Sequence, residues 1–338
     1  LDRSSERLLM VDFRYHLVSL VSVFMALAIG VILGAGPLQN SIGTTLSSQV
    51  ESLRKSRDEA RTEADTANNA LSENEKQLDS AGTQLVGGTL KDRRVAIVAL
   101  PGVEDSDLKA AEDKVSKAGA TVAGTVTLAD SYAATSANPY RNTLARSLAQ
   151  YVGEKSDADP HVVVASGVGR LLFMGSSDPN MTVIRDALTA KDNQMIQIQG
   201  DVEGGVQAVV VVTPKKMEID KSAATPAAET KSVSNGYVKM VKTLSSKGPT
   251  VTVGEGTSST SLLAKVREAK GAGSTVDSLD TVAGRINVAI AVASEIKGSH
   301  VHLGQGDGAQ AVIGTRVDAP ATPTQAPEPA SGPTSEEG

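Results

Sequence analysis

The stretch Leu17–Leu38, LVSLVSVFMALAIGVILGAGPL, constrains the fold most because it contains no charged residue. A bilayer core of roughly 30 Å requires about 20 apolar residues in a helix, and this stretch is long enough. A secretory signal has a shorter apolar core of about 7–15 residues, and Pro37 just after the LGAG sequence disfavours cleavage there. We therefore expect a retained transmembrane helix over residues 17–38, with a cleaved signal or a buried core helix as alternatives.

Flanking charge predicts how this helix is oriented. Arg3, Arg7 and Arg14 precede the apolar stretch, whereas residues 39–50 contain no Lys or Arg. Positively charged residues next to a span remain on the cytoplasmic side. We therefore expect a short cytoplasmic N-terminus over residues 1–16, with Met10 or Val11 as candidate start residues. The protein would be a single-pass protein of the cell membrane whose C-terminal domain is extracytoplasmic.

A heptad pattern follows the span and predicts a coiled-coil helix over residues 41–86. Apolar residues recur at alternating steps of four and three, which is the spacing of a coiled-coil seam. The predicted seam contains Leu46, Val50, Leu53, Ala60, Ala64, Ala67, Leu71, Leu78 and Leu85. Arg57 and Asn74 interrupt it, and its alanines bury little area. The pattern indicates a weak homodimer seam or a groove for a partner helix, and the alternative is a solvated stalk.

The span carries a pairing pattern of its own. Ala26, Gly30 and Gly34 are spaced four apart, which places small residues on one side of the helix. Such small-xxx-small ridges allow transmembrane helices to approach closely. Because the pattern leads into a heptad helix, we expect a homo-oligomer.

Residues 91–316 alternate between apolar strand-like runs and amphipathic helical segments. This alternation predicts a mostly parallel, Rossmann-like α/β domain with helices on both faces of the sheet. The expected strands lie within residues 93–102, 121–128, 161–166, 195–199, 206–214 and 249–256, and the expected helices within 108–119, 139–152, 180–192, 228–248, 258–271 and 280–298. The last helix is apolar nearly all round, so we expect it to be buried.

The C-terminal segment, residues 319–338, is rich in Pro, Ala and acidic residues and lacks apolar periodicity. Such a composition cannot bury enough surface to fold, so we expect a disordered tail.

Composition excludes several classes of function. The net charge of −6 argues against nucleic-acid binding, and the absence of Cys excludes disulfides and thiolate metal sites. Aromatic residues make up 2% of the chain, so a stacking platform for bases or sugars is not expected. No nucleophile motif or dinucleotide-binding glycine pattern is present. We therefore predict that the protein is not an enzyme and find no residues that predict a cofactor.

His300 and His302, in SHVHLGQGDG, are the candidate metal ligands. In an extended segment they lie on one face, and two imidazoles suit copper or zinc. Two ligands make a weak site unless Asp307, a backbone group or a second chain completes it; the alternative is an ordinary polar strand edge.

Two glycine-containing segments are candidate ligand loops. In GEGTSSTS, residues 254–261, the backbone amides could hold an anion, but Glu255 would repel phosphate, so a turn with a Ser or Thr helix cap is the alternative. The segment SGVGRLLFMG, residues 166–175, lacks the third glycine of a dinucleotide loop. For His161 we expect an ordinary position at the start of a strand.

The stretches DFRYHLVSLVSVFMALAIGVILGAGPL and STVDSLDTVAGRINVAIAVA, together with the rod between them, resemble the actinobacterial copper transporter MctB family over residues 11–315. The resemblance implies a cell-envelope protein of copper efflux or resistance, with copper as its metal. It also implies a link to envelope assembly and division. A single span without charged residues is not a pore by itself, so several copies would have to assemble.

Two functions from different classes follow. One is a membrane component that moves or senses copper. The other is a non-enzymatic scaffold or adaptor whose rod pairs with itself or with a partner coiled coil, and whose outer domain docks envelope proteins that remodel peptidoglycan or act in cell division.

Overall fold

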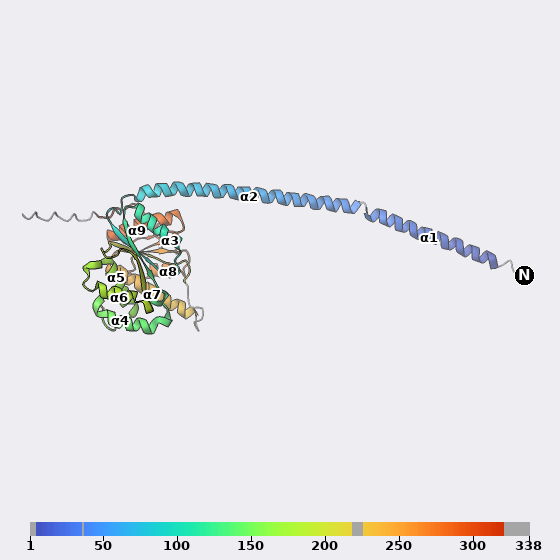
Figure 1. The fold of residues 1–338 in the computed structure, drawn as a ribbon. Helices are drawn as coiled ribbons and strands as arrows, with labels where there is room; N and C mark the ends of the chain where they lie inside the picture. The colour runs from blue at the N-terminus through green and yellow to red at the C-terminus, as the bar shows by residue number, and fades with distance from the viewer. Residues whose placement is uncertain (1–4, 36, 218–225, 321–338) are drawn as a thin grey trace, which may run out of the picture. The chain divides into compact units, whose positions relative to one another are not determined.

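Two compact units make up the chain, residues 1–74 and 75–338, and the computed structural model describes residues 5–35, 37–217 and 226–320. Helix α1 covers Ser5–Ala35 and helix α2 covers Pro37–Val86 (Figure 1). Within α1, the segment Phe13–Gly34 is long and apolar enough to cross a membrane, and its side chains are exposed. The N-terminal apolar helix expected from the sequence is therefore present.

The second unit is built on a seven-stranded sheet in the order β3-β2-β1-β4-β5-β6-β7. All neighbouring strands are parallel except β2 and β3, which are antiparallel. The strands are β1 Arg94–Ala99, β2 Thr121–Leu128, β3 Ile196–Gly200, β4 Ala208–Val212, β5 Thr250–Gly254, β6 Ser274–Asp277 and β7 His302–Leu303. The mixed α/β class with a mostly parallel sheet is thus confirmed.

Helices cover both faces of this sheet (Figure 1). One face packs against α4 Asn138–Val152, α5 Pro160–Phe173, α6 Met181–Thr189, α7 Pro226–Lys247 and α8 Leu262–Glu268. The other face packs against α3 Asp105–Lys117, α9 Val282–Ile296 and the end of α2.

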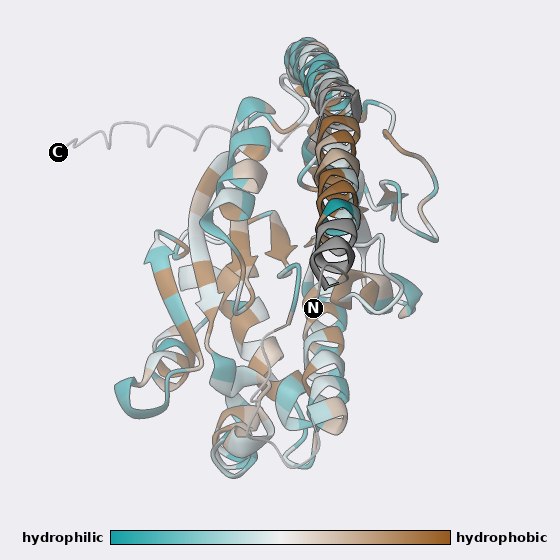
Figure 2. Ribbon diagram, turned by 90° about the vertical axis from the view of Figure 1, so that its right-hand side faces the viewer, coloured by the Kyte–Doolittle hydropathy of each residue, from teal (hydrophilic) through white to brown (hydrophobic). Residues whose placement is uncertain are grey.

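The strands supply side chains to both cores in alternation, because successive side chains of a strand point to opposite faces. In β4, Val209 and Val211 belong to the core under α5 and α7, whereas Val210 and Val212 belong to the core under α9. All five residues of β4 are buried, as expected of a central parallel strand covered on both sides. Figure 2 shows hydrophobic residues concentrated along the strands in the middle of this unit.

The strand predicted at residues 161–166 is wrong, because these residues form the first part of α5. Pro160 occupies the first turn, and the Asp159 side chain accepts a hydrogen bond from the His161 amide, so a helix start is well specified. The helix is buried on nearly all sides. A short apolar run of this kind cannot be assigned to strand or helix by periodicity alone.

The last turns of α2 belong to the α/β unit. The Nζ atom of Lys114, whose side chain is 1% exposed, lies 2.5 Å from Oδ1 of Asp79. A Cβ atom on Gly82 would collide with the side chain of Ile286 on α9, so glycine permits this close approach. The Arg316 guanidinium donates to the carbonyl oxygens of Leu85 and Gly87 and satisfies the C-terminal end of α2.

The α9 helix confirms the prediction of a buried final helix, since its residues from Ile286 to Glu295 are all buried. Thr281 caps its first turn by accepting a hydrogen bond from the Gly284 amide. The coiled coil and the domain boundaries predicted from the sequence stay predictions, and residues 321–338 of the predicted tail lie outside the described part of the chain.

Candidate functional site

The two histidines proposed as metal ligands lie at the β7 edge of the sheet. His302 begins β7 and pairs in register with Thr275 of β6. Its Nδ1 atom lies 3.0 Å from the Thr275 hydroxyl, and Nδ1 of His300 lies 2.8 Å from a carboxylate oxygen of Glu295. The His300 side chain is 64% exposed, whereas that of Glu295 is 4% exposed. Each ring is thus held through Nδ1, which leaves its Nε2 atom for a ligand.

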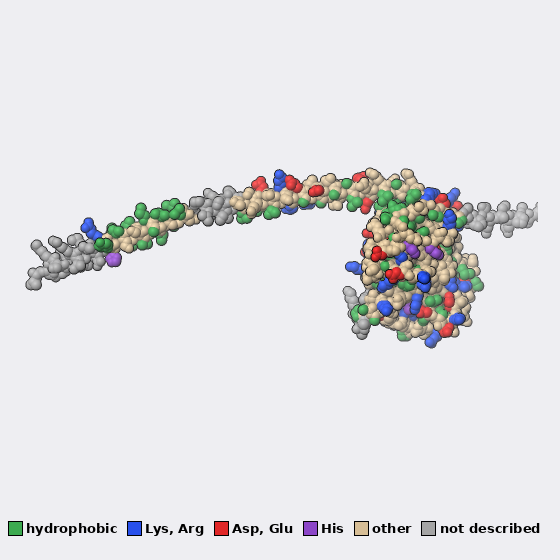
Figure 3. Space-filling view, turned by 180° about the vertical axis from the view of Figure 1, so that it is seen from behind, with side chains coloured by type: hydrophobic (Ala, Val, Ile, Leu, Met, Phe, Trp, Pro, Cys, Tyr) green, Lys and Arg blue, Asp and Glu red, His purple; other side chains and the backbone are tan. Residues whose placement is uncertain are grey.

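Electrostatics favours the neutral form of His302, which is the form that binds metals. Burial lowers the pKa of His302, and the positive charges of Arg267 and of protonated His300 lower it further, against an opposing effect of Glu295. Figure 3 shows histidine side chains close together on one face of the α/β unit.

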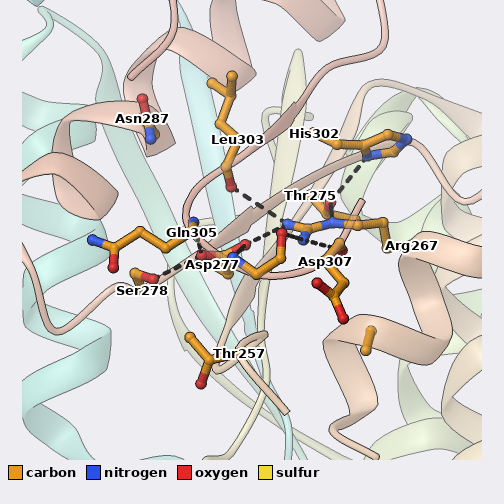
Figure 4. A network of polar contacts seen from close by, with 12 residues as sticks. Thr257, Arg267, Thr275, Asp277, Ser278, Asn287, His302, Leu303, Gln305 and Asp307 are labelled. Atoms are coloured by element: carbon orange, nitrogen blue, oxygen red, sulfur yellow. Dashed lines mark hydrogen bonds and ion pairs between the residues drawn. The ribbon is translucent and has the colours of Figure 1, made fainter. Parts of the chain in front are cut away.

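A buried ion pair fixes the strand that carries His302 (Figure 4). Nη2 of Arg267 lies 2.8 Å from Oδ2 of Asp277, and the two side chains are 5% and 0% exposed. Arg267 also donates to the Thr275 hydroxyl at 2.8 Å and to the Asp307 carbonyl oxygen at 3.0 Å. The same guanidinium therefore ties α8, β6 and the loop after β7 together behind the histidine edge.

Asp277 is fully saturated with hydrogen bonds. Besides Arg267, it accepts bonds from the Ser278 hydroxyl at 2.7 Å and from the amides of Gln305 at 2.6 Å and Gly306 at 3.1 Å. Burial alone would raise the pKa of Asp277, but these hydrogen bonds outweigh it and hold the pKa below its ordinary value. Asp277 is therefore a carboxylate at neutral pH.

The loop after β7 depends on glycine at one position. Gly304 has φ +132°, and a Cβ atom there would collide with the carboxylate of Asp277. Only glycine adopts such a backbone conformation without strain. The glycines of LGQGDG thus let the loop wrap around Asp277, and no anion or dinucleotide is needed to explain them.

The described residues contain no group of three or more His, Asp or Glu side chains placed to hold a metal ion together. Asp307, considered from the sequence as a third ligand, therefore does not join the two histidines in one such group. A metal on His300 and His302 would have to complete its coordination with water or with groups from another chain.

Sequence reasoning missed the Asp277–Arg267 pair. A signal for it exists, because Asp277 is an acidic residue at the end of the apolar strand STVD and a glycine-rich segment follows later. The partner on α8 and the amides of the loop after β7 come together only in the folded sheet.

The GEGTSSTS segment forms a turn whose anion position is already filled. A carboxylate oxygen of Glu255 accepts hydrogen bonds from the amides of Thr257 at 2.8 Å and Ser258 at 3.0 Å. Ser261 caps α8 by accepting a bond from the Ala264 amide at 3.1 Å. The helix-cap alternative is therefore confirmed.

The SGVGRLLFMG segment lies mostly within α5 and is not an extended ligand loop. Gly167 faces Ile184 and Leu188 of α6, and Gly169 faces Lys247 at the end of α7. These glycines allow α5 to pack closely between its neighbours.

The predicted pairing surfaces of the first unit are accessible in the single chain. Nothing lies within 4 Å of the Cβ positions of Gly30 and Gly34, which share the small-residue ridge with Ala26. The seam residues Leu46, Leu53 and Leu71 are 59%, 70% and 59% exposed.

Comparison with known proteins supplies the family. The profile described as "Copper transport outer membrane protein, MctB" matches residues 10–313. Proteins named Copper transporter MctB from Mycobacterium bovis and from two strains of Mycobacterium tuberculosis are each 29% identical over 320 residues, covering 90% of this chain and 99% of theirs. The resemblance stated from the sequence is thus confirmed, and the chain belongs to the MctB family of copper transport outer membrane proteins.

Proposed function

We propose that this protein is a membrane-anchored component of copper transport or homeostasis in the cell envelope, and that His300 and His302 bind copper as it passes. The observation that carries the proposal is the fixation of both imidazoles through Nδ1 at the β7 end of the sheet. Metal-ligating histidines commonly donate their second ring nitrogen to a carboxylate or another acceptor, which orients the ring for the metal. Glu295 and Thr275 occupy the places of such acceptors.

The incomplete coordination of this pair suits a transport role better than storage. A transported ion must bind well enough to be captured and weakly enough to leave. Two imidazoles that no third described ligand joins leave coordination positions for water or for a donor from a second protein. Copper can then be exchanged without breaking a closed four-ligand site.

The first unit supports one membrane arrangement. Arg3, Arg7 and Arg14 favour a cytoplasmic N-terminus, which would put the α/β unit and the histidine pair outside the cytoplasm. The ridge of Ala26, Gly30 and Gly34 and the exposed leucines of α2 favour assembly of several copies. Assembly would be required for any passage through the membrane, because one apolar helix encloses no path.

The test uses the full-length protein in detergent micelles with Cu(II) as the probe. We expect an electron paramagnetic resonance signal with nitrogen coordination in the wild type, and its loss in a His300→Asn/His302→Asn double variant. Asp307→Asn is the matched control, because this nearby side chain is exposed and outside the histidine pair. Retention of the nitrogen-coordinated signal in the double variant would refute the site.

A second experiment asks whether a copper role in cells depends on His300 and His302. Cells that lack the protein should lose copper tolerance, which the wild type should restore and the double histidine variant should not. Full rescue by the double variant would leave a copper role that does not use His300 and His302.

The exposed seam of α2 supports the scaffold function as a second candidate. Leu46, Leu53 and Leu71 expose more than half of their surface, which a lone helix in water does not favour. Replacing Leu53 and Leu71 with Glu should abolish self-association or partner capture while the α/β unit remains folded. Unchanged association would count against the seam. Neither candidate function requires catalysis.

A further inference from the structure

A cleft of about 1120 Å3 opens where β4, β5 and β6 end, and the copper role does not use it. In sheets of this kind ligands bind outside the carboxyl ends of the strands, where loops from both faces meet. The cleft has the same surroundings: residues from α7 and α8 line it on one face of the sheet, and residues from α3 and the turn before α9 line it on the other.

The α7 and α8 wall is basic. Lys216, Lys231 and Lys265 line it, and none of the three forms an ion pair with a carboxylate among the described residues. The ammonium group of Lys265 donates to the Ser234 hydroxyl at 3.0 Å. Glu268 also lies on this wall, and the wall carries more positive than negative charge.

The opposite wall is acidic. Asp107 and Asp280 line the cleft there, and Lys215 lies 3.1 Å from Glu104 and 3.7 Å from Asp107. One ammonium group therefore lies near two carboxylates. Burial raises the pKa of Asp107, and the negative charges of Glu104 and Asp280 raise it further, in spite of Lys215. Lys215 offsets only part of the negative charge of Glu104, Asp107 and Asp280, so this wall carries net negative charge.

Hydroxyl groups connect the two walls. The turn between β5 and α8 brings Thr257, Ser258, Ser259 and Thr260 to the cleft. Because Glu255 already occupies the amides of this turn, the turn offers hydroxyl groups rather than an empty anion position. Glu255 also lines the cleft at this turn, with a carboxylate oxygen that already accepts hydrogen bonds from the turn's amides. A ligand in the cleft would therefore meet lysines at one side, carboxylates at the other, and hydroxyl groups beside Glu255 between them.

We propose that this cleft binds a zwitterionic ligand of the size of a short peptide, with its carboxylate toward Lys231 and Lys265 and its ammonium group toward Asp107 and Asp280. Complementary charge at both ends fixes the orientation of such a ligand. The volume exceeds what a single amino acid would fill, and the absence of aromatic side chains among the lining residues disfavours a flat ring as the ligand.

Four forms of tetra-alanine test the proposal on the full-length protein in detergent: free, N-acetylated, C-amidated and capped at both ends. We expect the free peptide to bind in isothermal titration calorimetry, and each cap to weaken binding about tenfold, the effect of one lost charge-assisted hydrogen bond. Equal binding of all four forms, or no binding at millimolar concentration, would overturn the proposal.

Two surface variants assign the ends of the ligand. Lys231→Gln should weaken binding of the free peptide about tenfold and leave binding of the C-amidated peptide unaffected. Asp280→Asn should weaken binding of the free peptide by a similar factor and leave binding of the N-acetylated peptide unaffected. Lys242→Gln, at an exposed position of α7 outside the cleft, is the matched control. An equal loss in the control, or a loss that ignores which end is capped, would refute the assigned orientation.

Discussion

Replacing Asp277 with Asn tests the central claim that one buried ion pair holds the histidine edge of the sheet. The carboxylate accepts four hydrogen bonds, from Arg267, Ser278, Gln305 and Gly306. An Asn side chain has the same shape but only one acceptor oxygen. In one orientation its NH2 group would face the Gln305 amide, and in the other it would face the Gly306 amide and Arg267. At least one buried backbone donor therefore loses its partner.

The expected loss of stability is large because the guanidinium left behind is also buried. The Arg267 side chain is 5% exposed, so water cannot replace the lost carboxylate. Removing one partner of a buried ion pair destabilises a protein by about 3–5 kcal/mol, against a total stability of about 5–15 kcal/mol. A change of about 3 kcal/mol corresponds to roughly a hundredfold change in an opening equilibrium.

Hydrogen exchange of the full-length protein in detergent measures this change locally. In Asp277→Asn, peptides covering residues 303–308 and β6 should exchange at least about a hundredfold faster, while those from the α4 and α6 region change least. A paired Arg267→Met/Asp277→Leu variant should recover part of the protection, because no unpaired charge remains. A change below about tenfold in Asp277→Asn would refute the role given to this pair.

The stability difference between wild type and Asp277→Asn should also depend on pH. The pKa of Asp277 is lower in the folded protein than in the unfolded chain, so the stabilising effect is present above the unfolded value of about 4 and is lost as the pH falls through the folded value. The difference between wild type and Asp277→Asn should therefore be constant at neutral pH and shrink in acid. A difference that grows in acid would contradict the assignment.

Three further predictions concern other positions. Gly304→Ala should destabilise the β7 edge by about 1–3 kcal/mol, because its backbone conformation is unfavourable for alanine and the new Cβ atom meets Asp277; faster exchange of residues 303–308 would show it, and unchanged exchange would contradict it. Gly82→Val should cost about 1–3 kcal/mol by forcing α2 away from Ile286, and limited proteolysis should then cut near residue 82. Gly87→Ala, whose new Cβ atom would meet backbone oxygens of Thr83 and Gln84 but no side chain, is its control. Burial lowers the pKa of His161, so protonating this side chain is harder in the folded protein than in the unfolded chain. The free energy of unfolding should therefore decline as the pH falls from about 6.5 toward the pKa of His161 in the folded protein. His161→Gln should remove that part of the pH dependence of the melting temperature.

Features that depend on local residue order were predictable. The run AVVVV of β4 is apolar throughout and consists of four β-branched valines after one alanine, and a strand of this composition needs a sheet covered on both faces. The apolar helix before the rod and the burial of α9 follow from composition and periodicity in the same way. At residues 161–166 the periodicity of the apolar run did not separate helix from strand. The signal that identifies the helix is also local, because Pro160 and its Asp159 cap mark a helix start directly before the run.

The candidate sites required the tertiary structure, because their parts are distant in sequence. His300 and His302 were visible as a pair, but Glu295 and Thr275, which orient them, come from α9 and β6. Asp277 receives amides from a loop 28 and 29 residues later in the chain. The opposite charges of the cleft likewise meet only because parallel strands bring their carboxyl ends to one edge. The sequence by itself determined which segments could be helices, strands and a membrane span, since those depend on neighbours within a few residues; the sheet order, which sets long-range contacts, decided what those segments bring together.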